Sequence, residues 1–87
     1  MYILVLTSKF QKQIARLVRG NRGLKIQLSK TFKLLNSDFD HPSLRSHKLS
    51  GTDNWSISVN QSIRIILHWE KDKLYLLEIG KHEDVYN

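Results

Sequence analysis

Four side chains of this 87-residue chain could together carry acid–base and phosphate chemistry: His47, Arg64, His82 and Tyr86. A histidine titrates near neutral pH, so it can both accept and donate a proton. An arginine keeps its charge and can bind two phosphate oxygens at once. Cleavage of RNA by its own 2′-hydroxyl needs a base for that hydroxyl, a cation for the phosphorane and an acid for the leaving 5′-oxygen. Metal-free RNA cleavage is therefore a candidate reaction.

Each of these residues also has a purely structural interpretation. His47 would be solvated in a loop, and Arg64, one charge in an apolar strand, would lie at a sheet edge or on an open polar face. His82 would cap a turn, and Tyr86 would cover the end of the core. From the residues alone, both interpretations stay open.

The chain offers no pattern for a metal or a disulfide. It contains no cysteine, which excludes a thiolate zinc site, a cysteine nucleophile and a disulfide scaffold. Metal-ligand spacing is also absent among the acidic residues Asp38, Asp40, Asp53, Glu83 and Asp84. We expect neither a metal nor a cofactor.

Charge is distributed unevenly along the chain. Residues 1–37 hold eight basic residues and no acidic ones, whereas residues 38–87 hold six basic and eight acidic residues. The net charge is +6. This pattern indicates either a solvated basic helix surface or an electrostatic footprint for a polyanion, which would be a nucleic acid or an acidic protein.

The first half of the chain predicts one strand and two helices. Tyr2 to Leu6 is an apolar strand-like run, too short for a signal peptide or a membrane span, which favours a cytoplasmic protein without a membrane partner. Ser8 and Gln11 fit a capping box at a helix start, and Gly20 is a natural stop. A second helix is predicted from about Asn21 to Asn36, with apolar residues at helical spacing.

The second half predicts a loop and three strands. The loop spans residues 37–53, and the strands run over residues 55–59, 63–69 and 73–79. The element order is β-α-α-β-β-β. We expect one α+β domain over residues 1–87, with a helix hairpin on one face of a small, mostly antiparallel, four-stranded sheet and a site on the other face.

Three segments resemble the RelE/ParE superfamily of bacterial toxins, in particular its RelE-like and YafQ-like ribosome-dependent mRNA interferases. They are HPSLRSHKLSG at 41–51, WSISVNQSIRII at 55–66 and IGKHEDVY at 79–86. Together with the element order, the likeness covers nearly the whole chain. It implies a type II toxin that cuts mRNA on the ribosome and is neutralised by a cognate antitoxin.

The resemblance also implies roles for the four residues. His82 matches the histidine that YafQ-like members use as a proton donor or acceptor, and Tyr86 matches their terminal aromatic residue. Arg64 matches the strand arginine that RelE-like members place on the scissile phosphate. His47 matches a loop histidine of the YafQ-like branch. Basic residues expected to contact ribosomal RNA or substrate are Lys9, Lys12, Arg16, Arg19, Lys30, Lys48 and Lys81.

Two departures keep other functions open. RelE proper has lysines where this chain has Ser56 and Ser58, and the YafQ-like histidine expected near Ser58 is missing. A non-catalytic member of the fold is therefore the main alternative, either a ParE-like gyrase inhibitor or a decayed toxin that only binds an antitoxin. ParE-like members lack the histidine at the position of His82, which favours the RNase branch. A generic basic nucleic-acid-binding domain is the third possibility.

Overall fold

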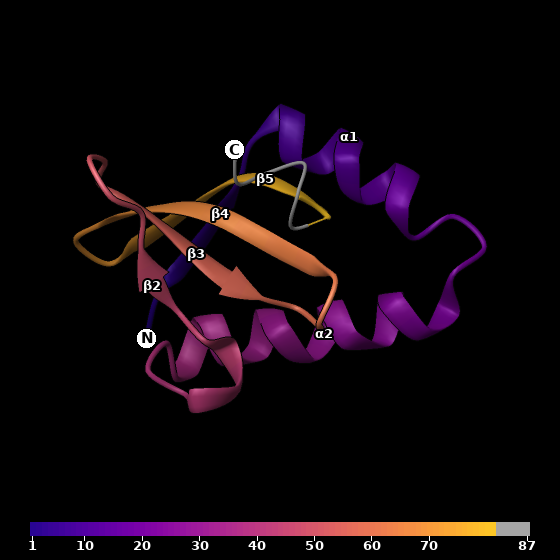
Figure 1. Cartoon of the computed structure of the whole chain (residues 1–87), viewed down its shortest axis with the longest axis horizontal. Coiled ribbons are helices and arrows are strands. Elements are labelled where there is room, and N and C mark those ends of the chain that lie inside the picture. Colours follow the sequence, from indigo (N-terminus) through magenta and orange to yellow (C-terminus); the bar gives the residue numbers. More distant parts are fainter. Residues whose placement is uncertain (82–87) are drawn as a thin grey trace.

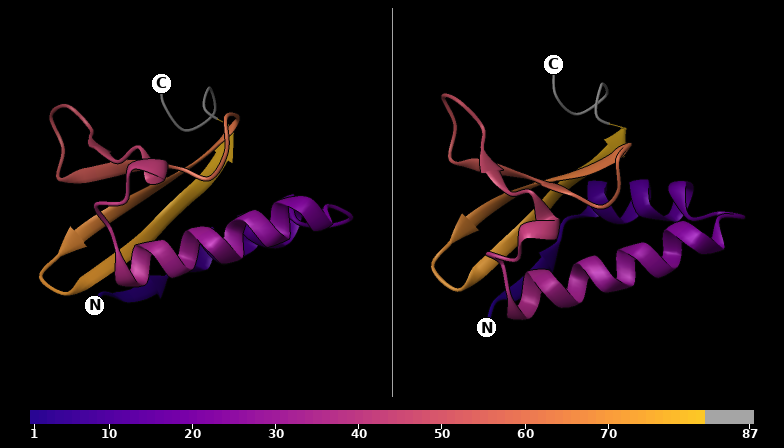
Figure 2. Two further views of the ribbon diagram at one scale, coloured as in Figure 1. Left: turned by 90° about the horizontal axis from the view of Figure 1, so that it is seen from below. Right: turned by 60° about the horizontal axis from the view of Figure 1, so that its bottom comes forward.

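The computed structural model describes residues 1–81, which form a five-stranded sheet with two helices on one of its sides (Figure 1, Figure 2). The elements in chain order are β1 (Ile3–Leu6), α1 (Ser8–Leu17), α2 (Arg22–Ser37), the 3₁₀ helix η1 (Pro42–Leu44), β2 (His47–Lys48), β3 (Asn54–Ser58), β4 (Ile63–Glu70) and β5 (Lys73–Lys81).

The strands are arranged in the order β1-β5-β4-β3-β2. β1 pairs with β5 in parallel, and the three other pairs are antiparallel. The predicted α+β class, element order and mostly antiparallel sheet are confirmed, but the predicted number of strands is wrong by one. The additional strand, β2, lies in the segment that was predicted to be a loop. Its two residues pair with Ser56 and Trp55, and a strand of this length is too short to show an alternating pattern.

The hydrophobic core lies between the helices and one face of the sheet. Ile65 and Leu67 of β4 are fully buried, as are Leu35 of α2 and Phe10 of α1. Alternate residues of β4 enter this core because successive side chains of a strand point to opposite faces. The period-two pattern of β4 therefore places Arg64 on the face away from the helices.

The start of α1 differs from the predicted capping box by one residue. The N-cap is Thr7, whose Oγ1 accepts a hydrogen bond from the amide of Phe10 and donates one to the carbonyl of Leu76 at 2.8 Å. Gln11 donates from Nε2 to the carbonyl of Leu6, and Ser8 is the first helical residue. Thr7 thus ends β1, starts α1 and ties both to β5.

The far half of β5 is covered by α1 rather than by a strand. β1 pairs only with the first residues of β5, from Lys73 to Leu76. Beyond them, Gln13 of α1 accepts a hydrogen bond from the amide of Ile79 at 2.8 Å. The side chain therefore satisfies a backbone donor at a sheet edge, where unpaired groups would otherwise invite other strands.

Replacing Thr7 with alanine should lower the free energy of unfolding by about 1 kcal/mol, because the helix loses its N-cap. Ser8→Ala is the matched control, since Ser8 is exposed at the first helical position, and it should change stability by less than about 0.5 kcal/mol. Urea unfolding monitored by circular dichroism measures both. A larger loss for Ser8→Ala than for Thr7→Ala would contradict the assigned cap.

Candidate functional site

The sheet face opposite the helices carries two neighbouring rows of side chains. One row crosses four strands through His47, Ser56, Ile66 and Glu78, and the next passes through Ser58, Arg64 and Gly80. Residues paired directly across strands point to the same face. The register therefore places Arg64 on the open face, opposite Ser58 and one row away from Ser56.

Arg64 is held in a fixed orientation by two acceptors. Its Nε donates to Oγ of Ser56 at 2.8 Å, and its Nη2 donates to the backbone carbonyl of Arg45 at 3.2 Å. Ser56 lies on β3 and is fully buried, whereas Arg45 follows η1. Two contacts from separate elements pre-orient the planar guanidinium, which is a suitable arrangement for binding an oxyanion.

Ser56 and Ser58, where the resemblance to RelE led us to expect lysines, are structural residues here. Ser56 is 0% exposed and Ser58 is 8% exposed. Ser58 donates from Oγ to the carbonyl of Asn60 at 2.7 Å and so stabilises the turn into β4. A lysine at position 56 would need space now occupied by Arg64, so the two serines are not vacant positions for added cations.

The same face carries a carboxylate that no sequence motif indicated. Glu78 belongs to the row of Ser56 and forms an ion pair with Lys9 of α1 at 2.6 Å. Lys9 thereby offsets a negative charge that would repel a phosphate on this face. No sequence pattern indicated this pair, because the residues are far apart in the chain and are brought together only when α1 packs on β5.

The structure places His47 near Arg64, through Ser56. His47 is exposed on β2 and pairs directly with Ser56, the residue that accepts the hydrogen bond from Arg64. His82 and Tyr86, the two other predicted site residues, lie outside the described residues. Their roles therefore stay predictions.

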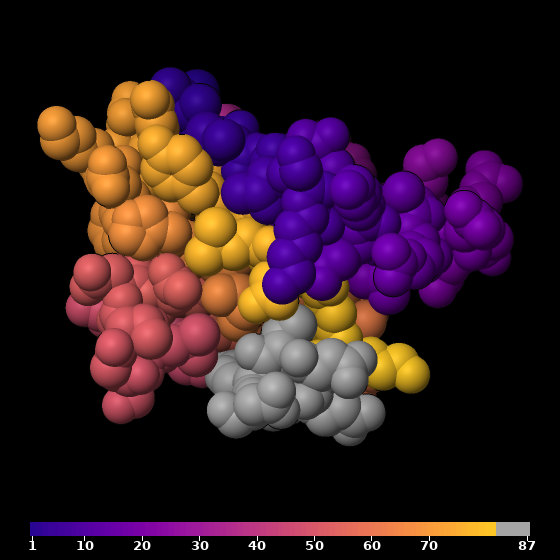
Figure 3. Space-filling view, turned by 90° about the horizontal axis from the view of Figure 1, so that it is seen from above, coloured from indigo at the N-terminus to yellow at the C-terminus, as the bar shows by residue number. Residues whose placement is uncertain are grey.

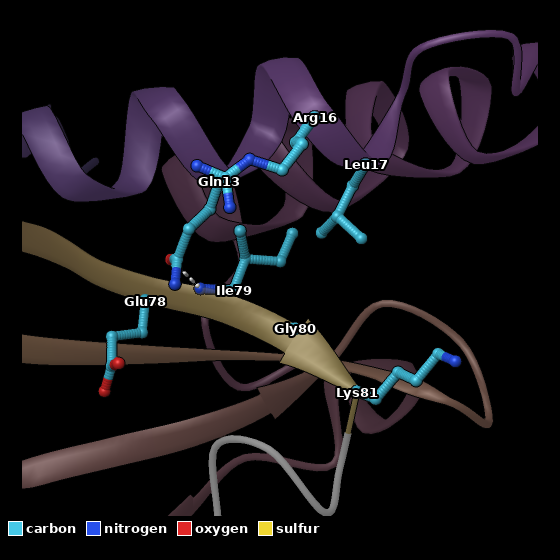
Figure 4. Close-up of a pocket in the computed structure, with 7 residues that line it drawn as sticks. All are labelled: Gln13, Arg16, Leu17, Glu78, Ile79, Gly80 and Lys81. Carbon is cyan, nitrogen blue, oxygen red and sulfur yellow. Dashed lines mark hydrogen bonds between the residues drawn. The ribbon is translucent and has the colours of Figure 1, made fainter.

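The seven predicted RNA-contacting cations are all exposed, and they lie in separate places. Arg16 and Lys81 line a hollow of about 270 Å³ between α1 and the end of β5, beside the Gln13–Ile79 hydrogen bond (Figure 4). Lys30 lines a second hollow, of about 200 Å³, with Ser43 and Ser58. Lys48 is 3.9 Å from Asp53. In the space-filling view, α1 forms a continuous surface next to the end of β5 (Figure 3).

The described part of the chain shows neither a metal-binding cluster nor a membrane-spanning helix. No three histidine, aspartate or glutamate side chains within residues 1–81 are grouped as a metal site. Neither helix in this part of the chain is long and apolar enough to cross a membrane.

Comparison with solved structures identifies the fold. A copper-bound toxin mutant from Helicobacter pylori superposes with a TM-score of 0.83 at 21% identity, over 99% of this chain and 100% of that one. YafQ from Escherichia coli superposes with a TM-score of 0.80 at 15% identity, over the full length of both chains. The chain has the RelE-like toxin fold. No protein-family model and no curated protein matches the sequence.

The role of Ser56 in orienting Arg64 can be tested without an activity assay. Ser56→Ala should speed the exchange of the Arg64 Nε proton with water and lower stability by about 1 kcal/mol, because one partly buried hydrogen bond is lost. Ser58→Ala, the control, removes a neighbouring hydroxyl that bonds elsewhere and should leave that proton unchanged. Nitrogen-15 spectra of the arginine side chains report the exchange. Equal exchange in both variants would show that Ser56 does not orient Arg64.

Proposed function

We propose that this protein is the toxin of a type II toxin–antitoxin system, a ribosome-dependent endoribonuclease that cleaves mRNA without a metal. The observation that carries the proposal is the guanidinium of Arg64, held by Ser56 and Arg45 on the open face of a RelE-like sheet. Arg64 lies on the face of β4 away from the core, where a pre-oriented cation can stabilise a phosphorane.

The proposed reaction uses the chain's own groups. Attack of the 2′-hydroxyl on the adjacent phosphate forms a phosphorane, whose charge Arg64 stabilises. His47 or His82 accepts the proton of the attacking hydroxyl, and a histidine also donates the proton that the leaving 5′-oxygen needs. Tyr86 forms the aromatic wall of the substrate pocket. The products are a 2′,3′-cyclic phosphate and a 5′-hydroxyl. The proton lost by the 2′-hydroxyl is matched by the proton gained by the 5′-oxygen.

The proposed partners are mRNA on the ribosome and an antitoxin. YafQ has been crystallised in a complex with DinJ, described as a toxin–antitoxin complex, and it has the same fold as this chain. The basic N-terminal half provides exposed cations for ribosomal RNA, since affinity for nucleic-acid backbones comes largely from Lys and Arg. An acidic antitoxin segment would compete for the same charges.

A second candidate function is an antitoxin-binding protein without nuclease activity. It is favoured by the burial of Ser56 and Ser58, because neither position can supply the cations of RelE proper. The orientation of Arg64 favours the nuclease, since a guanidinium held by two acceptors on the open face suits the charge of a phosphorane.

A cleavage assay on ribosome-bound mRNA separates the two functions. His82→Gln should slow cleavage about 10²- to 10⁴-fold, as expected for loss of a general acid or base. Arg64→Ala should slow it about 10²- to 10³-fold, because the charge of the phosphorane loses its cation. His68→Gln is the control, since His68 lies on the same strand and pairs with Glu70. If the wild type does not cut, or if folded His82→Gln and Arg64→Ala proteins cut at its rate, the nuclease proposal fails.

Whether the basic residues of the two helices contact ribosomal RNA is tested by measuring ribosome binding. Reversing Lys12, Arg16, Arg19 and Lys30 to glutamate should weaken binding sharply and flatten its salt dependence, because fewer counterions are released. Reversing Lys71 and Lys73 at the β4–β5 turn is the control and should have little effect. Sedimentation with ribosomes over a range of salt concentrations measures both. Unchanged binding of the folded fourfold variant would mean that these residues form only a solvated surface.

A further inference from the structure

Arg45 has a backbone conformation that its residue type does not explain. Its φ and ψ are both 46°, in the left-handed region, where a side chain is disfavoured and glycine is usual. Lys71 is the other non-glycine residue with a positive φ within residues 1–81, and it lies in the tight turn between β4 and β5. A glycine would end η1 at position 45 with less strain, so local structure alone does not account for the arginine.

The strained residue lies beside the guanidinium of the site. The left-handed turn presents the carbonyl of Arg45 to Nη2 of Arg64 at 3.2 Å, while its own amide donates to the carbonyl of Pro42 at 3.1 Å. The backbone of Arg45 is thus fixed on both sides. Its side chain is exposed and takes part in none of the ion pairs that the structure shows within residues 1–81.

The backbone of Arg45 contacts the guanidinium of Arg64, and the Arg45 side chain is exposed, so a second cation is attached directly beside the proposed phosphate position. Ser56 and Ser58, the neighbours of Arg64 on β3, are buried and uncharged, so neither supplies a cation for a second phosphate. We infer that Arg45 is a second phosphate-binding residue, which contacts the backbone of single-stranded RNA next to the phosphate bound by Arg64. The inference rests on the proposed function for its ligand, whereas its test requires only binding.

Arg45→Gly is the decisive variant, because it removes the cation while relieving the strained backbone. The probe is a single-stranded oligonucleotide with 2′-O-methyl groups, which the proposed reaction cannot cleave. Relative to the wild type, Arg45→Gly should bind it about 3- to 10-fold more weakly at low salt. Loss of one phosphate contact should also reduce the slope of log affinity against log salt by about 0.7. Arg45→Lys should keep the wild-type slope.

Lys71→Gly is the matched control, since it also removes one positive charge and one left-handed side chain, at a distant turn. It should keep the affinity and the slope of the wild type. The same result for Arg45→Gly, or no binding by the wild type, would overturn the inference. So would a shift of the Arg64 Nε resonance in Arg45→Gly, because the loss would then come from the position of Arg64.

This design separates two kinds of failure. Wild-type protein that binds the oligonucleotide through Arg45 but never cuts ribosome-bound mRNA would refute the proposed function and support the inference. Protein that cuts mRNA and binds equally well with glycine at position 45 would refute the inference alone.

Discussion

The structure depends on β4, which is hydrogen-bonded on both sides and buries alternate residues against the helices. Ile65 and Leu67 must face the core, and a shift of one residue would expose them and bury Arg64 instead. The register is therefore strongly specified by the hydrophobic effect. It also determines the partners of Arg64, because pairing with β3 places Ser58 opposite it and Ser56 within reach of its Nε.

Serine and lysine at position 56 would produce different electrostatics. Lysines add mobile point charges next to Arg64, and each must lose side-chain entropy to hold one geometry. A buried serine instead supplies an acceptor, so that one planar donor is held in a single orientation before any ligand binds. Ser56 thus contributes orientation rather than charge, and the charge of Glu78 on this face is offset by Lys9 of α1.

Local patterns predicted most of the fold. Strands β3, β4 and β5 were placed within two residues at either end, because alternation and turn residues are visible in the sequence itself. The helix cap was missed by one residue, since Thr7 and Ser8 are both good caps and the choice depends on the bond from Thr7 to Leu76. β2 was missed because its two residues form a strand only through β3.

The site was predicted less completely, for a related reason. Arg64 stood out as one charge on an apolar strand, and its placement on the open face followed from the period of two. The burial of Ser56 and the contact with Arg45 depend on register and on the end of η1, neither of which a single sequence displays. Glu78 was overlooked because its partner is distant in the chain.

Charge links the stability of this small domain to its partners. Among the ion pairs described within residues 1–81, Lys9 is the member of the basic N-terminal half that has an acidic partner. The other cations of that half therefore repel one another. A bound polyanion would relieve this repulsion and stabilise the fold by mass action. Ribosomal RNA and an acidic antitoxin would both do so, and stabilisation by a partner is therefore common to the catalytic and the non-catalytic function. The two functions differ at Arg64, because phosphate cleavage uses an oriented cation to stabilise the charge of the phosphorane.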